Sequence, residues 1–142
     1  GEVLCDDALL TKRGELAALI LDVWNGEPTA IAQELIGAAD IATPHIAGYS
    51  YEGKINGTAM AVQAFARHFG IKELYDFVPG HTPVPRLELR DADGGFLPTP
   101  EVASRLLSAF PIYELDKALR GNPSSFEKIR GEYQYRREFL WR

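Results

Sequence analysis

The first third of the sequence contains apolar runs of strand length separated by a segment with helical spacing. Residues 16–23 form a near-continuous apolar run, which predicts a parallel strand buried on both faces. Residues 29–38 place Leu35 and Ile36 on one side of a helix, and residues 40–43 predict a second short strand. Two strands joined by a helix indicate α/β architecture with a parallel sheet, although two strands are too few to close a doubly wound sheet.

A longer amphipathic pattern follows. Between Ser50 and Phe69, apolar residues recur at intervals of three and four, and Gly70 stands directly after the last of them. This spacing predicts one long helix that ends at the glycine. Near the start of the chain, Asp6 and Gly14 mark the limits of a short predicted helix. The expected apolar face of the long helix consists of Ile55, Ala59, Val62, Phe65, Ala66 and Phe69.

Proline and glycine interrupt the pattern between residues 77 and 85, which predicts a stiff linker and a domain boundary near Arg86. Beyond it we expect a small α+β module of short strands and three helices. The strands are expected at 86–90 and 137–141, and the helices at about 99–109, 113–119 and 124–135. The predicted organisation has three parts: residues 1–47, a long helix within 48–76, and the linker with its module within 77–142.

The composition narrows the range of partners. With 46% apolar and 25% charged residues, the chain has the composition of a folded globular protein. A net charge of -5 argues against nucleic acid or an anionic membrane as a partner. Asp22 interrupts the longest apolar run, so we expect no membrane span. A lone cysteine, Cys5, and an opening without a secretory signal favour a cytoplasmic protein.

Two short motifs carry the candidate chemistry, each just past the end of a predicted strand. Asp22 and Glu27 follow the first strand, and His45 follows the second. Because ligands bind at the carboxyl edge of parallel sheets, we expect Glu27 and His45 to meet there. A carboxylate on one imidazole nitrogen stabilises the imidazolium and leaves the other nitrogen free for proton transfer. Such a pair suits the interconversion of an alcohol and a ketone.

Each of these residues has a simpler explanation when it is taken alone. An aspartate often ends a buried strand as a turn residue, and a single histidine is more often structural than catalytic. Gly48 fits a backbone turn into the long helix, and Tyr49 fits a packing residue at the start of that helix. Without a family resemblance, the simpler explanations of Asp22, Glu27 and His45 are favoured. His68 and His81 have no cluster of metal ligands around them, so no metal site is expected.

The motifs also resemble those of a known family. Asp-Val-Trp-x-Gly-Glu-Pro at residues 22–28, followed by Pro-His-Ile-Ala-Gly-Tyr at 44–49, is similar to the end of the catalytic core of the D-2-hydroxyacid dehydrogenases. A looser likeness continues through residues 52–58 and 126–138, so the resemblance covers essentially the whole chain. It implies a remnant of a Rossmann-type parallel sheet and a long crossing helix, followed by a small α+β dimerisation domain.

The resemblance implies a role for each candidate residue. His45 would be the general acid/base, and Glu27 the carboxylate that orients and polarises it. Asp22 and Gly48 would contact the cofactor NAD, and Tyr49 would contact the substrate. The implied substrate is a small phosphorylated hydroxy acid, oxidised to its 2-oxo acid in the biosynthesis of pyridoxal 5′-phosphate. The implied assembly is a homodimer formed through the C-terminal domain.

The sequence departs from the family pattern in one large respect. It contains no G-x-G-x-x-G motif for the cofactor phosphates, and the family's substrate-binding arginine would stand immediately before Gly1. We therefore expect a C-terminal fragment with little activity by itself. Two alternatives remain open: another D-2-hydroxyacid dehydrogenase, such as a phosphoglycerate dehydrogenase, and a stand-alone dimerisation module.

Overall fold

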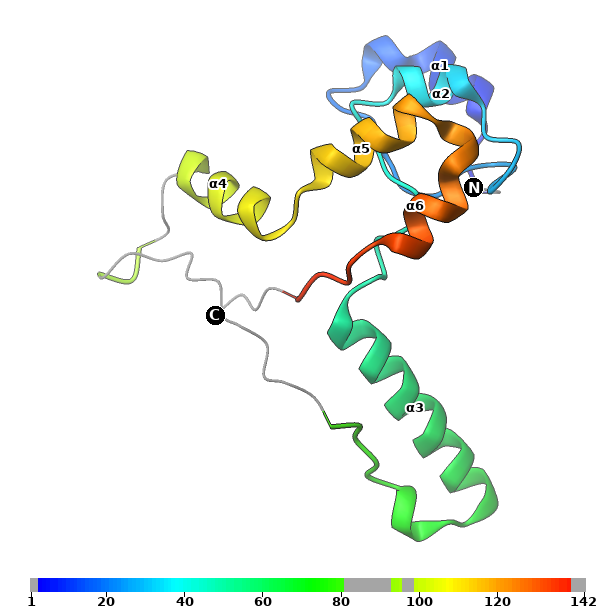
Figure 1. Cartoon of the computed structure of the whole chain (residues 1–142), viewed down its shortest axis with the longest axis vertical. Coiled ribbons are helices and arrows are strands. Elements are labelled where there is room, and N and C mark those ends of the chain that lie inside the picture. The colour runs from blue at the N-terminus through cyan, green and yellow to red at the C-terminus, as the bar shows by residue number, and fades with distance from the viewer. Residues whose placement is uncertain (1–2, 81–92, 96–98, 139–142) are drawn as a thin grey trace. The chain divides into compact units, whose positions relative to one another are not determined.

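The described part of the chain divides into two compact units. The computed structural model describes residues 3–80, 93–95 and 99–138. The first unit combines Gly1–Ala47 with Phe110–Gln134, and the second combines Gly48–Ala109 with Tyr135–Arg142 (Figure 1). The domain boundary expected near Arg86 and the strand expected at 86–90 lie outside the described residues.

The first unit contains the predicted pair of parallel strands. Strand β1 (Ile20–Leu21) pairs with β2 (Ile41–Ala42), and helix α2 (Gln33–Ala38) forms the crossover between them. The register places Ile20 opposite Ile41 and Leu21 opposite Ala42. The predicted α/β architecture is therefore confirmed, although both strands are shorter than the apolar runs suggested.

The expectation that the first strand is buried on both faces is wrong. Leu19 and Leu21 are buried, whereas the intervening Ile20 is 61% exposed. Successive side chains of a strand point to opposite faces, and only the face that carries Leu21 packs against the hydrophobic core of this unit. The apolar run therefore forms a strand with only one buried face. An unbroken apolar run does not distinguish this case from full burial, because apolar residues also occur on exposed faces.

The helices on either side of β1 begin and end differently from the expectation. Helix α1 (Asp6–Lys12) confirms the short N-terminal helix, and a 3₁₀ turn, η1 (Arg13–Glu15), extends it past the glycine at 14. Helix α2 begins at Gln33 rather than 29, because a tight turn occupies the preceding residues. Ala30 N–H donates to the Gly26 carbonyl at 2.7 Å. Gly26 has a φ of 75°, which glycine adopts without strain.

Two later helices complete the core of the first unit. Helix α5 (Ile112–Gly121) contributes the buried Leu119, and helix α6 (Phe126–Glu132), which follows the 3₁₀ turn η3 (Pro123–Ser125), contributes the buried Phe126. Both predicted helices are confirmed, with α6 shorter than expected. The core cluster consists of Leu19, Leu21, Trp24, Leu35, Ile36, Ala39, Ala42, Leu119 and Phe126.

A polar cluster ties α5 to β2 and to the end of α2. Asp116 accepts a hydrogen bond from the Ala42 N–H at 2.7 Å and two from the Arg120 guanidinium at 2.9 and 2.8 Å. Arg120 also donates to the carbonyls of Ile36 and Ala39, at 2.6 and 2.7 Å, at the C-terminal end of α2. Burial raises the pKa of Asp116, but the bonds from Arg120 and Ala42 outweigh it and hold the pKa below its usual value.

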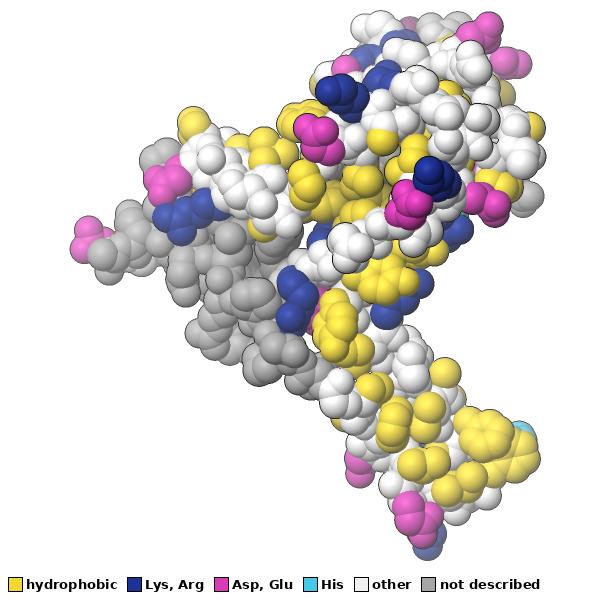
Figure 2. Space-filling view, viewed as in Figure 1, with side chains coloured by type: hydrophobic (Ala, Val, Ile, Leu, Met, Phe, Trp, Pro, Cys, Tyr) yellow, Lys and Arg dark blue, Asp and Glu magenta, His cyan; other side chains and the backbone are white. Residues whose placement is uncertain are grey.

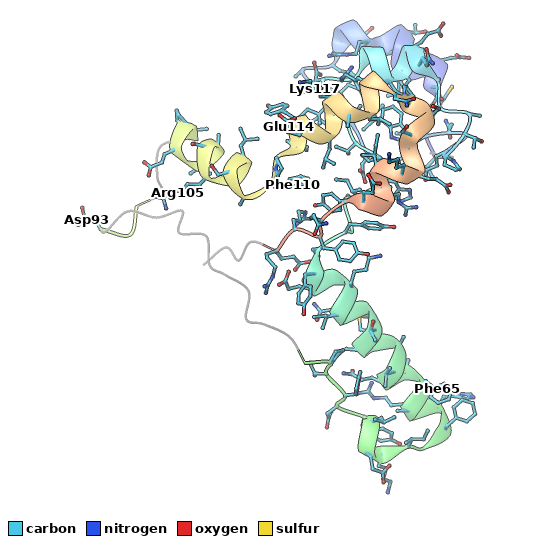
Figure 3. The ribbon with its side chains drawn as sticks, viewed as in Figure 1. Phe65, Asp93, Arg105, Phe110, Glu114 and Lys117 are labelled. Atoms are coloured by element: carbon cyan, nitrogen blue, oxygen red, sulfur yellow. The ribbon has the colours of Figure 1, made fainter. Side chains whose placement is uncertain are left out.

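The second unit contains the long helix that the sequence predicts. Helix α3 (Tyr51–Phe69) begins at Ser50, whose side chain accepts from the Gly53 N–H at 2.9 Å, and ends at Gly70, which has a φ of 71°. Its apolar face is only partly covered: Phe65 is 56% and Phe69 62% exposed. Figure 2 shows apolar side chains gathered along α3, and Figure 3 shows Phe65 projecting from the helix.

The segment after residue 134 packs against the start of α3. Glu52 is buried, pairs with Arg137 and accepts from the Glu138 N–H at 2.9 Å, while Ser50 donates to Glu138 at 2.6 Å. Burial raises the pKa of Glu52, but these hydrogen bonds and the charge of Arg137 outweigh it, so the pKa lies below its ordinary value. Arg136 forms an isolated parallel bridge with Ser50. Of the strand expected at 137–141, Arg137 and Glu138 are not in a strand, and residues 139–141 lie outside the described residues.

Two further elements belong to the second unit. A 3₁₀ turn, η2 (Lys72–Leu74), follows α3, and helix α4 (Thr99–Ala109) confirms the helix expected there. Within the described ranges, none of the helices combines the length and the hydrophobicity that a membrane span requires.

Replacing Asp116 with asparagine keeps the shape of the side chain but removes its charge. We expect D116N to lower the free energy of unfolding of the first unit by about 1–3 kcal/mol, the usual contribution of hydrogen bonds to charged groups. Urea unfolding followed by tryptophan fluorescence in a W141F background, where Trp24 is the sole tryptophan, measures the change. Glu114→Gln is the matched control, because Glu114 is exposed on the same helix (Figure 3). Equal stabilities of the two variants would contradict the role of Asp116.

The lowered pKa of Asp116 gives this contribution a pH dependence of definite sign. The ordinary value is 3.8 and the folded value lies below it, so the contribution is complete above the ordinary value and disappears as the pH falls through the folded value. We expect the stability difference between wild type and D116N to shrink steadily below about pH 4. The same unfolding experiment at a series of acidic pH values tests this. A difference that grows on acidification would reverse the assigned sign.

Candidate active site

The loops that follow β1 and β2 lie at one edge of the parallel pair. Because both strands run in the same direction and are hydrogen-bonded neighbours, the residues after Leu21 and after Ala42 leave the sheet on the same side. The first of these loops carries Asp22 and Glu27, and the second carries His45. All three residues belong to the first unit.

Glu27 and His45 are in direct contact, as the sequence predicts. The Oε1 atom of Glu27 is hydrogen-bonded to Nδ1 of His45. The second oxygen of Glu27 accepts from the Trp24 N–H at 3.1 Å, which fixes the carboxylate on its own loop. The side chains are partly open to solvent, His45 by 40% and Glu27 by 23%. Among the described residues, no group forms a hydrogen bond with Nε2 of His45.

Asp22 organises the loop that carries the histidine. Its Oδ1 atom accepts from the Thr43 hydroxyl at 2.6 Å and from the Ile46 N–H at 2.8 Å, and Oδ2 accepts from the Ala47 N–H at 2.9 Å. Ile46 is buried and anchors the loop in the unit. The carboxylate thus binds the chain on both sides of His45, at Thr43 before it and at Ile46 and Ala47 after it.

The backbone of His45 has a φ of 54°, in the left-handed region that a residue with a β-carbon rarely adopts. Such a conformation persists only where the surroundings hold it, and it occurs often at functional sites. Here the surroundings include the Asp22 carboxylate and, from helix α6, the side chain of Arg130, whose Nε donates to the His45 carbonyl at 3.1 Å.

The structure does not place the other two candidate residues with this group, because Gly48 and Tyr49 belong to the second unit. Gly48 is exposed, and an added Cβ would meet no described atom within 4 Å. Tyr49 packs edge to face on Tyr135 at 5.6 Å between ring centroids, and the ammonium of Lys54 lies 4.0 Å from the centre of its ring. Their roles at cofactor and substrate stay predictions.

Two residues contribute to the site in ways that the sequence does not indicate. Arg130 stands 85 residues from His45, and nothing in the local pattern of α6 indicates that partner. Trp24 belongs to the first motif, yet its function becomes visible only in the structure: the buried indole donates to the Thr43 carbonyl at 2.8 Å and joins the two loops. Among the described residues, no cluster of three or more His, Cys, Asp or Glu side chains is arranged to hold a metal.

This geometry is suited to general acid/base chemistry. A carboxylate holds one nitrogen of an imidazole at the carboxyl edge of two parallel strands. The fold and the site together define an α/β unit that carries a carboxylate–histidine pair.

Comparison with known proteins points to a particular relative. No family model matches the chain. The chain is similar to the erythronate-4-phosphate dehydrogenases of Bacteroides thetaiotaomicron (35% identical over 140 residues), Porphyromonas gingivalis (37% over 142) and Bacteroides fragilis (41% over 140). Each alignment covers 97% of this chain and 37% of the relative. The chain thus spans little more than a third of the length of these curated relatives. The comparison thus supports the resemblance noted in the sequence: nearly the whole chain is similar to about a third of these erythronate-4-phosphate dehydrogenases.

Substitution of Asp22 by asparagine tests its role in the loop. The amide retains one acceptor oxygen in place of two, so the hydrogen bonds to the backbone N–H groups of Ile46 and Ala47 cannot all persist. We expect hydrogen exchange at these two amides to accelerate by about fivefold, because a lost hydrogen bond contributes about 1 kcal/mol. Asp40→Asn is the control, since Asp40 binds the Leu19 N–H instead. An unchanged exchange rate at the amides of Ile46 and Ala47 would show that Asp22 does not hold this loop.

Proposed function

We propose that the complete protein containing this chain oxidises 4-phospho-D-erythronate to (R)-3-hydroxy-2-oxo-4-phosphooxybutanoate with NAD, as a step in pyridoxal 5′-phosphate biosynthesis. The observation that carries the proposal is the Glu27–His45 pair, formed in a chain that is 35–41% identical to erythronate-4-phosphate dehydrogenases. The names of these relatives indicate the substrate, and the Glu27–His45 pair offers the acid/base chemistry that its oxidation requires.

His45 is the base of this reaction. Loss of hydride from a secondary alcohol carbon leaves a protonated ketone unless the hydroxyl proton departs at the same time, so a base must accept that proton. The Nε2 atom of His45 accepts it, and the imidazolium that results is stabilised by the Glu27 carboxylate on Nδ1. In the reverse direction the same imidazolium returns the proton. Glu27 also fixes the tautomer, because a carboxylate accepts only from a protonated nitrogen.

The chemistry that NAD supplies when bound is acceptance of the hydride. The described residues are compatible with a cofactor beside Asp22. A carboxylate has about four acceptor positions, and three of those on Asp22 are used within the chain, so one remains for an external donor such as an amide. The open space around Gly48 supports the proposal that another molecule approaches the backbone there, because the described atoms of the chain do not require glycine.

The remaining parts of the proposal concern the substrate and the assembly. We assign Tyr49 to substrate contact, in line with the family resemblance. We also propose a cytoplasmic homodimer that forms through the region of residues 77–142. Support for the dimer comes from the many aromatic residues near the end of the chain, a composition that is enriched at protein interfaces. They are Tyr133, Tyr135, Phe139 and Trp141.

The catalytic pair is tested in the complete protein by measuring hydroxy acid oxidation and NAD binding. We expect His45→Ala to abolish oxidation while leaving the dissociation constant of NAD nearly unchanged, because the base acts on the hydroxyl group. Glu27→Gln removes the charge that stabilises the imidazolium and is expected to lower kcat by about 10²–10⁴. His68→Ala is the control, since His68 is exposed on α3. Normal turnover by His45→Ala would exclude His45 from the mechanism.

A further inference from the structure

The peptide unit between His45 and Ile46 is held at both of its polar ends. Its carbonyl oxygen, on His45, accepts a hydrogen bond from Nε of Arg130 at 3.1 Å. Its N–H, on Ile46, donates to Oδ1 of Asp22 at 2.8 Å. A guanidinium and a carboxylate therefore bind opposite sides of one peptide plane, and both bonds involve a charged group, which makes them stronger than neutral ones.

This peptide plane determines where the imidazole lies. Its rotation sets ψ of His45, and together with the left-handed φ of 54° it fixes the direction of the Cα–Cβ bond. If the plane were released, the backbone of His45 would relax toward the α or β region, because a residue with a β-carbon is strained in the left-handed one. The imidazole would then move away from the carboxylate of Glu27.

The two bonds come from different parts of the chain. Asp22 directly follows β1, next to the sheet, whereas Arg130 comes from helix α6, which packs through Phe126 on the same core. Asp22 alone binds only the N–H side of the plane and the residues on either side of it. Helix α6 therefore contributes the hydrogen bond from Arg130 that holds the carbonyl group of His45.

We propose that Arg130 is a positioning residue of the active site, which acts through the His45 backbone to hold the imidazole against Glu27. Its effect on turnover rests on the proposed function; its effect on the position of the imidazole does not. Helix α6 is, in consequence, part of the machinery that shapes the acid/base group as well as a packing element of the first unit.

The position of the imidazole can be observed directly in the 142-residue chain. The proton shared by Nδ1 of His45 and Glu27 is expected to give a downfield NMR resonance, which is assigned by its disappearance in His45→Ala. Arg130→Met keeps most of the aliphatic stem and removes the donor. We expect this variant to shift the resonance upfield or to lose it through faster exchange with water. Lys128→Met is the matched control, since Lys128 is exposed on the same helix, and it is expected to leave the resonance unchanged.

Arg130→Lys tests recovery by a conservative change. The ammonium can donate to the His45 carbonyl but lacks the planar geometry of the guanidinium, so we expect the resonance to return in part. Circular dichroism of each variant confirms that the chain is folded. If Arg130→Met does not fold, Arg130→Gln replaces it, because glutamine is well accepted in helices and its side chain is shorter than that of arginine. A wild-type resonance in a folded Met or Gln variant would overturn the proposal.

Kinetics of the complete protein provide the second test. We expect Arg130→Met to lower kcat by about 10- to 100-fold, the usual effect of removing a partner that orients a functional group, with little change in the KM for the hydroxy acid. Lys128→Met is expected to retain wild-type kcat. If the wild-type protein has no dehydrogenase activity, the proposed function is wrong, and the NMR experiment still tests the position of the imidazole. If the wild-type protein is active and Arg130→Met changes neither kcat nor the resonance, only the positioning role of Arg130 is wrong.

Discussion

The parallel pairing of β1 and β2 is the constraint on which the site depends. The ladder is short, with only two pairs of residues in register, and it is extended on both sides by hydrogen bonds from Asp40 N–H to Leu19 and from Thr43 N–H to Leu21, at 2.7 and 2.9 Å. Because the strands run in the same direction, their following loops emerge together, and a glutamate on one loop reaches a histidine on the other. An antiparallel pair would carry the two loops to opposite ends.

So short a ladder needs support from elsewhere, and polar groups on the later helices supply it. Asp116 binds the backbone of β2 directly, and Arg120 holds Asp116 while it binds the end of α2. Arg130 binds the backbone of His45 itself. Apart from the ion pair between Arg120 and Asp116, these side chains bind backbone groups, so they set the course of the chain, and none of these hydrogen bonds involves the imidazole of His45 or the carboxylate of Glu27.

Asp22 shows how one carboxylate can fix the course of a whole loop. It accepts three hydrogen bonds from the loop around His45, from the Thr43 hydroxyl and from the N–H groups of Ile46 and Ala47. An aspartate directly after the strand suits this position, because its side chain is short enough to reach the neighbouring loop and its charge strengthens each hydrogen bond that it accepts.

The sequence by itself determined the elements whose signals are local: helix α3 between Ser50 and Gly70, the two strands, and the pairing of Glu27 with His45. Helical spacing, a terminal glycine and the shared edge of parallel strands are properties of short segments. Tertiary structure alone decided which face of β1 is buried, and which partners Asp116 and Arg130 find 74 and 85 residues away. Those contacts depend on how the later helices pack against the sheet, and no local pattern of residues encodes that packing.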